Sequence, residues 1–151
     1  MPMFYEADSA LSSAGLLAGR LLLALIFVHE GWSLIGSYGP AVAYLQKFGI
    51  SATLLPAVIL LQLSSGLLVV AGLLTRVAAL ALAAFCVFTA LFFHRQLADA
   101  NQLLHLQKDL AIAGGFLTLA VAGPGGCPSA DILRYLPMRD DLPEVGRLAT
   151  R

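Results

Sequence analysis

Two long uncharged segments, joined by only two residues, constrain this chain more than any other feature. The first segment, Ala52 to Leu74, has twenty-three residues without a charge, and the second, Val77 to Phe93, has none either. As a helix the first segment measures about 34 Å, enough to cross a hydrocarbon core of about 30 Å. Because only Thr75 and Arg76 connect them, the two helices must be antiparallel neighbours. The segments therefore predict a transmembrane hairpin.

Two further apolar runs, 15–35 and 103–122, are also long enough to span a membrane. They lack the period-2 alternation of strands and are rich in Leu and Ala, which favours helices. The sequence thus predicts an all-α fold, an integral membrane four-helix transmembrane bundle in residues 1–123. The expected spans are 15–35, 52–74, 77–93 and 103–122. Residues 124–151 are expected to form a C-terminal tail.

The composition supports a membrane protein. Hydrophobic residues make up 59% of the chain and charged residues only 12%, whereas soluble domains have about 45–50% and roughly 25%. Nine basic and nine acidic residues leave no net charge, which argues against a nucleic-acid partner. Between the first two spans, Tyr44, Leu45 and Phe48 share one helical face. This face predicts a short helix lying at the membrane interface.

The positions of Lys and Arg predict the orientation. Four crossings bring the N-terminus, the 75–76 turn and the tail to one side. That side holds six of the nine basic residues, namely Arg20, Arg76, Arg134, Arg139, Arg147 and Arg151. The other side holds Lys47, Arg95 and Lys108. The positive-inside rule therefore predicts that both termini are cytoplasmic.

Charged residues inside the spans are the candidates for function. Each costs about 2.5–3.5 kcal/mol in a membrane and usually faces a partner or a water-filled cavity. Arg20, Glu30, Lys108 and Asp109 sum to zero charge, so mutual pairing is expected. At about 100° per residue, five polar residues of the last span fall within an arc of roughly 120°. They are Asn101, Gln102, His105, Lys108 and Asp109.

Further polar residues lie at similar depth on the other spans. Glu30, Gln62 and His94 are in or near the outer half of their helices. Together with the arc they predict a polar pocket open to the outer face, with Arg20 and Asp109 as its floor.

Structural roles compete with this interpretation. Arg20 with Asp109, or Glu30 with Lys108, could be ion pairs that only fix the helix register. His94 could be a hydrated helix end, and Gln62 an interhelical hydrogen-bonding residue.

The cysteines exclude several kinds of site. Cys86 and Cys127 lie at different levels and form no CxxC motif, which argues against a disulfide, a zinc site and covalent haem.

Several motifs, taken in order, resemble one family. They are GRLLLALIF followed by GW, AGLLTR at the 75–76 turn, FH at the end of the third span, NQLLHLQKDLAIAGG in the fourth, and GPG followed by SAD. From about Gly15 to Asp131 the chain resembles the DoxX-like four-helix membrane proteins of bacteria and archaea. The resemblance implies a location in the bacterial cytoplasmic (inner) membrane.

The resemblance also implies an oxidoreductase or a subunit of one. The family is named after a subunit of a thiosulfate:quinone oxidoreductase, and other members are linked to detoxification of quinones or catechols and to thiol stress. The family's arginine and its fourth-helix histidine and lysine correspond to Arg20, His105 and Lys108. The chain departs from the family at Gln62, where Glu is usual, and at Leu34, where Lys is frequent. Glu30 stands where a small residue is common.

Quinone-linked redox chemistry is the leading hypothesis. The expected catalytic residues are His94, His105, Lys108 and Asp109, and the expected quinone-binding residues are Arg20, Glu30 and Gln62. Histidines exchange protons near neutral pH. Lys108 and Arg20 would stabilise a negative ring oxygen in a low dielectric. Asp109 and Glu30 would hold these cations or relay protons.

The source of electrons stays open. The chain has no dinucleotide-binding glycine motif and no cysteine pattern for an iron–sulfur cluster. Electrons must then come from a redox partner, soluble or membrane-bound, or from a small reductant; a non-covalent haem on His94 and His105 is disfavoured. The alternative function is a non-catalytic membrane anchor or assembly subunit, whose tail docks a soluble redox enzyme. A small-solute carrier is disfavoured unless the protein forms a homo-oligomer.

Overall fold

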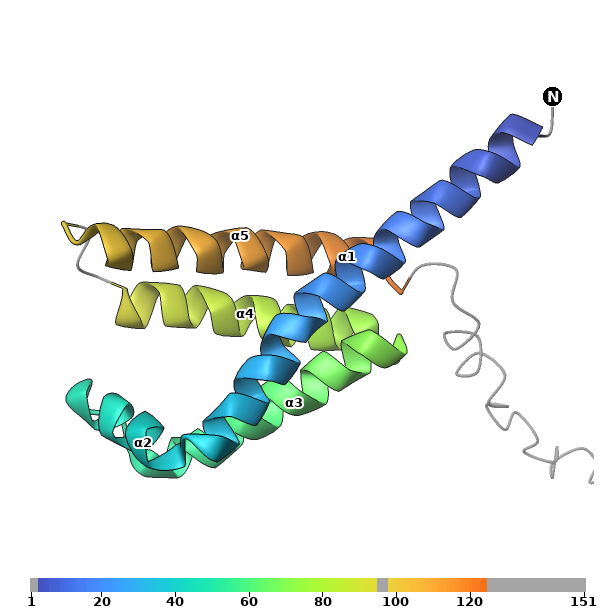
Figure 1. Cartoon of the computed structure of the whole chain (residues 1–151). Helices are drawn as coiled ribbons and strands as arrows, with labels where there is room; N and C mark the ends of the chain where they lie inside the picture. The colour runs from blue at the N-terminus through green and yellow to red at the C-terminus, as the bar shows by residue number, and fades with distance from the viewer. Residues whose placement is uncertain (1–2, 95–97, 125–151) are drawn as a thin grey trace, which may run out of the picture.

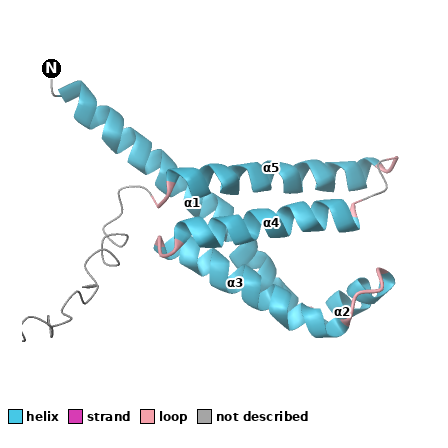
Figure 2. Cartoon of the chain, turned by 180° about the vertical axis from the view of Figure 1, so that it is seen from behind, coloured by secondary structure: helices cyan, strands magenta, loops and turns pink. Residues whose placement is uncertain are grey.

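The computed structural model describes residues 3–94 and 98–124, and these contain helices and no strand (Figures 1 and 2). The helices are α1 (Met3–Gly36), α2 (Tyr38–Lys47), η1 (Ala52–Leu54), α3 (Leu55–Ala71), α4 (Thr75–Phe93) and α5 (Ala100–Ala122). The all-α prediction is confirmed. The expected tail lies outside the described residues, apart from Pro124 at its start.

Three helical segments are long and apolar enough to cross a membrane. They are Ser12–Gly36, Ala52–Ala71 and Thr75–Phe93. With its 23 residues α5 is also long enough, but polar residues fill its first half, so it does not reach the same hydropathy. It lies alongside α4 for most of its length (Figure 1). The three apolar spans support a multi-pass membrane bundle, whereas crossing by α5 stays a prediction.

Glycines bring α1 and α3 into close contact. A Cβ atom on Gly31 would lie 2.8 Å from Leu63 Cγ, and one on Gly66 would lie 2.9 Å from Val28 Cγ2. Small residues allow such approach between membrane helices. The bundle therefore consists of two tight pairs, α1 with α3 and α4 with α5.

A very short turn joins the two pairs, as predicted, but it lies at 72–74, and the residues expected to form it, Thr75 and Arg76, begin α4. Gly72 ends α3 in the left-handed conformation, with φ 75°. Leu74 also has a positive φ of 47°, and α4 begins at the next residue, Thr75. The turn is so tight that a side-chain-bearing residue has to adopt a backbone conformation that favours glycine.

α1 contacts the C-terminal half of α5. A Cβ on Gly115 would lie 3.1 Å from Leu23 Cδ2. One turn further along α1, the Phe27 ring meets the Phe116 ring edge-on, with centroids 5.4 Å apart. Beyond this point the two helices diverge (Figure 1). Their divergence leaves space between the two pairs in the other half of the bundle.

The expected short helix between the first two spans is present as α2. Its aromatic residues turn toward the end of α4. The Tyr44 ring stacks on Phe93 at 5.7 Å, and Phe48 meets the same ring edge-on at 4.8 Å. The face predicted for the membrane interface thus packs, in part, on the bundle itself.

Candidate functional site

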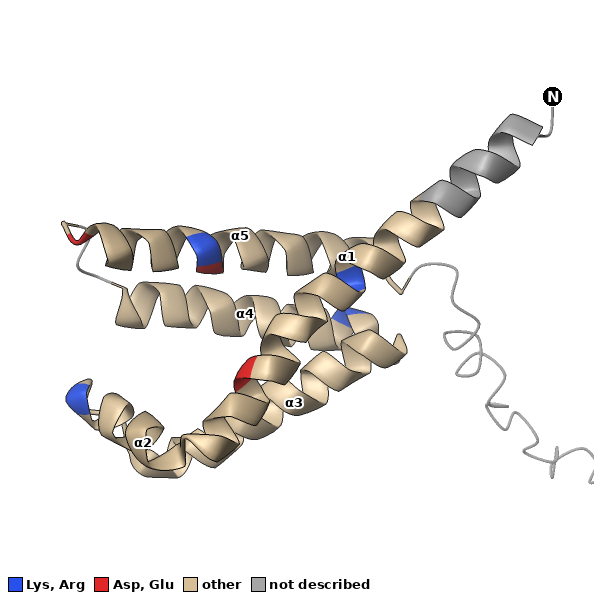
Figure 3. Ribbon diagram, viewed as in Figure 1, with Lys and Arg blue, Asp and Glu red and all other residues tan. Residues whose placement is uncertain are grey.

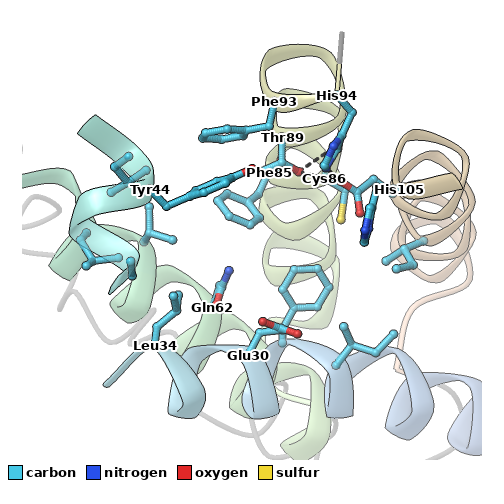
Figure 4. Close-up of a pocket in the computed structure, with 18 of the residues that line it drawn as sticks. Glu30, Leu34, Tyr44, Gln62, Phe85, Cys86, Thr89, Phe93, His94 and His105 are labelled. Carbon is cyan, nitrogen blue, oxygen red and sulfur yellow. Dashed lines mark hydrogen bonds and ion pairs between the residues drawn. The ribbon is translucent and has the colours of Figure 1, made fainter. Parts of the chain in front are cut away.

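A cavity of about 580 Å³ fills the space between the two helix pairs, under α2. Its wall is mostly apolar. The polar and thiol side chains that line it are Glu30, Ser37, Tyr44, Gln62, Cys86, Thr89, His94, His105, Lys108 and Asp109. Figure 4 shows several of them around the cavity. The structure therefore brings together six of the seven site residues expected from the sequence, all except Arg20.

An ionisable pair connects α4 to α5 at this cavity. His94 caps the C-terminal end of α4, and its Nε2 lies 3.7 Å from Asp109 Oδ2. Both side chains are largely buried, with exposed fractions of 15% and 19%. On the opposite edge of the ring, His94 Nδ1 is 2.7 Å from Gln102 Oε1. Both ring nitrogens of His94 therefore face a polar partner on α5.

Thr89 extends this row of polar contacts to the centre of α4. Its hydroxyl lies 3.3 Å from Asp109 Oδ2, and also 2.9 Å and 3.1 Å from the carbonyls of Cys86 and Phe85. A hydroxyl has one proton, so it can donate to only one of these acceptors at a time. Asp109 Oδ2 thus lies between two groups, Thr89 and His94, that can each share a proton with it.

His105 lies beside this pair. Its ring is nearly parallel to that of His94, with centroids 5.2 Å apart and an angle of 17°. Two histidines that hold one haem iron need nitrogens directed at it from opposite sides, whereas these rings stack, and the His94 nitrogens face Gln102 and Asp109. The arrangement does not fit a haem. Among the side chains described, those of residues 12–94 and 98–124, no group of three His, Cys, Asp or Glu could hold a metal ion.

Gln62 and Glu30 form the opposite wall. A Cβ on Gly31 would lie 3.4 Å from Gln62 Cβ, so the close α1–α3 packing puts the residue before it, Glu30, near Gln62. Gln62 is 6% exposed, and its Oε1 has no hydrogen-bond partner among the described residues. Figure 4 shows its amide directed into the cavity. A buried amide oxygen without a partner can accept a hydrogen bond from a bound molecule.

The expected ion pairs do not form. Glu30 and Lys108 line the cavity on different helices (Figure 3), but within the described ranges neither is in an ion pair. The one ion pair found there joins Asp109 to His94 instead.

Arg20 lies away from the cavity, so its placement on the floor beside Asp109 is wrong. Its Nη1 donates a hydrogen bond of 2.7 Å to the carbonyl of Pro124, just after α5. Asp109 is fifteen residues earlier, which corresponds to about 20 Å along a helix. Rotation around a helix axis predicts the direction of a side chain but not the depth at which two tilted helices meet.

Apart from His94 at its end, the α4 side chains at the site were not predicted from the sequence. Cys86, Thr89 and Phe93 are spaced three and four residues apart, which is the spacing of one helical face. This face lines the cavity, together with Phe85 and, from α2, Tyr44. The spacing could have revealed it, but the high apolar content of the helix concealed one thiol and one hydroxyl.

Comparison with known proteins identifies the family of this chain. Residues 15–95, more than half of the chain, match the model of the DoxX family. The chain belongs to the DoxX family.

Two relatives of this DoxX protein come from Escherichia coli strain K12. Inner membrane protein YqjF is 40% identical over 115 residues, which cover 76% of this chain and 88% of the relative. Inner membrane protein YphA is 30% identical over 117 residues, covering 73% and 84%. No solved structure matches the chain significantly.

The DoxX match covers only part of the cavity. It includes Glu30, Gln62 and His94, whereas α5 lies beyond residue 95. In this DoxX protein α5 supplies His105, Lys108 and Asp109.

Proposed function

We propose that this DoxX-family protein is a quinone-linked oxidoreductase, or the quinone-binding subunit of one, in the bacterial inner membrane. The names of both relatives support that location. The observation that carries the proposal is the single cavity that combines aromatic walls with a His94–Asp109 pair and a lysine.

The size and walls of the cavity suit a quinone ring. Its volume of about 580 Å³ falls within the range of roughly 300–1,000 Å³ for small-molecule sites. Phe85 and Phe93 offer aromatic surfaces to a flat ring. Ring carbonyls accept hydrogen bonds, and the amide of Gln62 and the ammonium of Lys108 can donate them. These two donors come from different helices, α3 and α5.

The polar side chains of His94, Thr89 and Asp109 are suited to the proton transfers of the reaction. Conversion of a quinone to a quinol takes up two electrons and two protons. The His94–Asp109 pair and His105 can each deliver one of the two protons, and Lys108 can stabilise negative charge on a ring oxygen in the low dielectric. The electrons come from a redox partner or from a small reductant such as a thiol or sulfur compound.

Binding of decylubiquinone to the purified protein in lipid nanodiscs tests the proposal. We expect saturable binding and an increase of the thermal midpoint. Lys108→Ala and His105→Ala should each weaken binding about tenfold or more, because a hydrogen bond from a charged or polar donor is lost. The matched controls are Lys47→Ala and His29→Ala, since neither residue lines the cavity. The proposal fails if binding survives both cavity substitutions.

A further inference from the structure

We infer that Gln102 holds His94 in the tautomer that makes the His94–Asp109 pair hold one additional proton, so that the pair has no net charge. The contacts that carry this inference are the 2.7 Å from Gln102 Oε1 to His94 Nδ1 and the 3.7 Å from His94 Nε2 to Asp109 Oδ2. Gln102 is then a positioning residue, which acts through His94.

The first step concerns Nδ1. An amide oxygen can only accept a hydrogen bond. Because Gln102 Oε1 lies within hydrogen-bonding distance of His94 Nδ1, that nitrogen carries a hydrogen. A neutral imidazole has one N–H, so the second nitrogen, Nε2, would then be bare.

The second step concerns Nε2. A bare Nε2 facing an ionised Asp109 would put two acceptors against each other. A proton between them removes this conflict, either on His94 as an imidazolium or on Asp109 as a carboxylic acid. In both forms the pair has zero net charge, which is the inexpensive state for ionisable groups inside a membrane bundle.

The surrounding charges are compatible with this state. His105 stacks on His94, and Lys108 and Glu30 line the same cavity from α5 and α1. In the described ranges α2, α3 and α4 add no further charged side chain to the wall, apart from His94 itself. Lys108 and Glu30 have opposite charges, so together they do not impose a net charge on the pair.

Gln102 thereby determines whether a proton is stored. Without its oxygen, neutral His94 can carry its hydrogen on Nε2 and donate it to ionised Asp109. Without the Gln102 oxygen, the His94–Asp109 pair therefore holds one proton fewer than in the wild type. Use of the stored proton in a reaction rests on the proposed function, but the protonation state itself does not.

Nitrogen NMR of the full-length protein, labelled with ¹⁵N-histidine in nanodiscs, tests the inference without any quinone. The chain has three histidines, and the signals that disappear in His94→Asn belong to His94. In the wild type we expect a protonated Nδ1, with the additional proton either on Nε2 or on Asp109. A bare Nδ1 on His94 in the wild type would overturn the inference, whatever the variants of residue 102 show.

Variants of residue 102 complete the test. In Gln102→Leu we expect loss of the Nδ1–H signal and an N–H at Nε2. Gln102→Glu keeps an acceptor and should restore Nδ1–H. Asn101→Leu is the matched control, because its side chain is exposed one position away, and it should leave His94 unchanged. An unchanged His94 spectrum in Gln102→Leu would contradict the inference, whatever the result of quinone binding.

Discussion

At the scale of single residues, the polar groups that define the candidate site are those with identified partners on a neighbouring helix. Asp109 faces Thr89 and His94, and His94 also faces Gln102. Residue types alone identified His94 and Asp109 but could not pair them, because pairing depends on how α4 and α5 pack side by side.

Thr89 offers a direct residue-scale prediction. Thr89→Val keeps the shape of the side chain and removes the hydroxyl that lies 3.3 Å from Asp109. We expect a loss of about 1 kcal/mol in stability, typical of one hydrogen bond, visible as a lower thermal midpoint. Thr118→Val is the control, because the Thr118 hydroxyl bonds only the Gly114 carbonyl on an exposed helix face. Equal effects of the two substitutions would contradict a special role for Thr89.

Substitution of Leu74 is expected to increase the stability of the protein. Its φ of 47° is a conformation that favours glycine or asparagine, and its side chain is exposed. Leu74→Asn should raise the thermal midpoint, with a gain of about 1 kcal/mol from relieved strain. Leu73→Asn, at the neighbouring position without a positive φ, should give no gain. The strain interpretation is wrong if both variants behave alike.

At the scale of elements, glycines determine which helices pair. The runs of apolar residues sufficed to predict the helices, and the short turn sufficed to make α3 and α4 neighbours. The crossing of α1 could not be predicted, since it depends on Gly31 and Gly66 fitting against Leu63 and Val28. That crossing is also why Arg20 misses the cavity.

Substitution of Gly66 tests the α1–α3 contact. Gly66→Val should destabilise the protein by about 1–3 kcal/mol, because its side chain would collide with Val28 and overpack the contact. Gly114→Ala is the matched control on α5. A Cβ there meets nothing within 4 Å, so we expect a gain of up to about 1 kcal/mol from helix propensity. Thermal unfolding in detergent measures both, and a neutral Gly66→Val would refute the tight pairing.

The aromatic contact between α2 and α4 should control access to the cavity. Cys86 is only 3% exposed. Phe93→Ala removes the ring on which Tyr44 and Phe48 pack, so maleimide labelling of Cys86 should become several-fold faster. A Cys127→Ser background isolates the signal, and Phe88→Ala, an exposed ring elsewhere on α4, is the control. Labelling that is equally slow in Phe93→Ala would exclude α2 as a cover.

At the scale of the whole molecule, α1 and the start of α4 are both tied to the C-terminal end of α5. Arg20 of α1 bonds the Pro124 carbonyl, and a Cβ on Gly123 would lie 3.4 Å from Arg76 Nε at the start of α4. Positive side chains near the C-terminal end of α5 also match the direction of its helix dipole. The count of basic residues by side suggests that this end faces the cytoplasm.

Reporter fusions test this orientation. We expect green fluorescent protein fused after Arg151 to fluoresce and alkaline phosphatase at the same position to be inactive, since α5 would return the chain to the cytoplasm. Phosphatase inserted after Gly49, between α2 and α3, should be active. Activity of the C-terminal phosphatase would show that α5 does not cross, or that the bundle is inverted.

The divergence of α1 from α5 has a consequence for selectivity. Because α1 meets α5 near Leu23 and Phe27, while Glu30 and Lys108 line the cavity from the two helices, we expect the cavity to open to lipid between them. A lipid-soluble molecule can then enter the cavity from the bilayer with its polar group first, while its hydrocarbon tail stays among the lipid chains. Partitioning into lipid, as much as fit to the polar groups, should therefore decide which compounds this protein encounters.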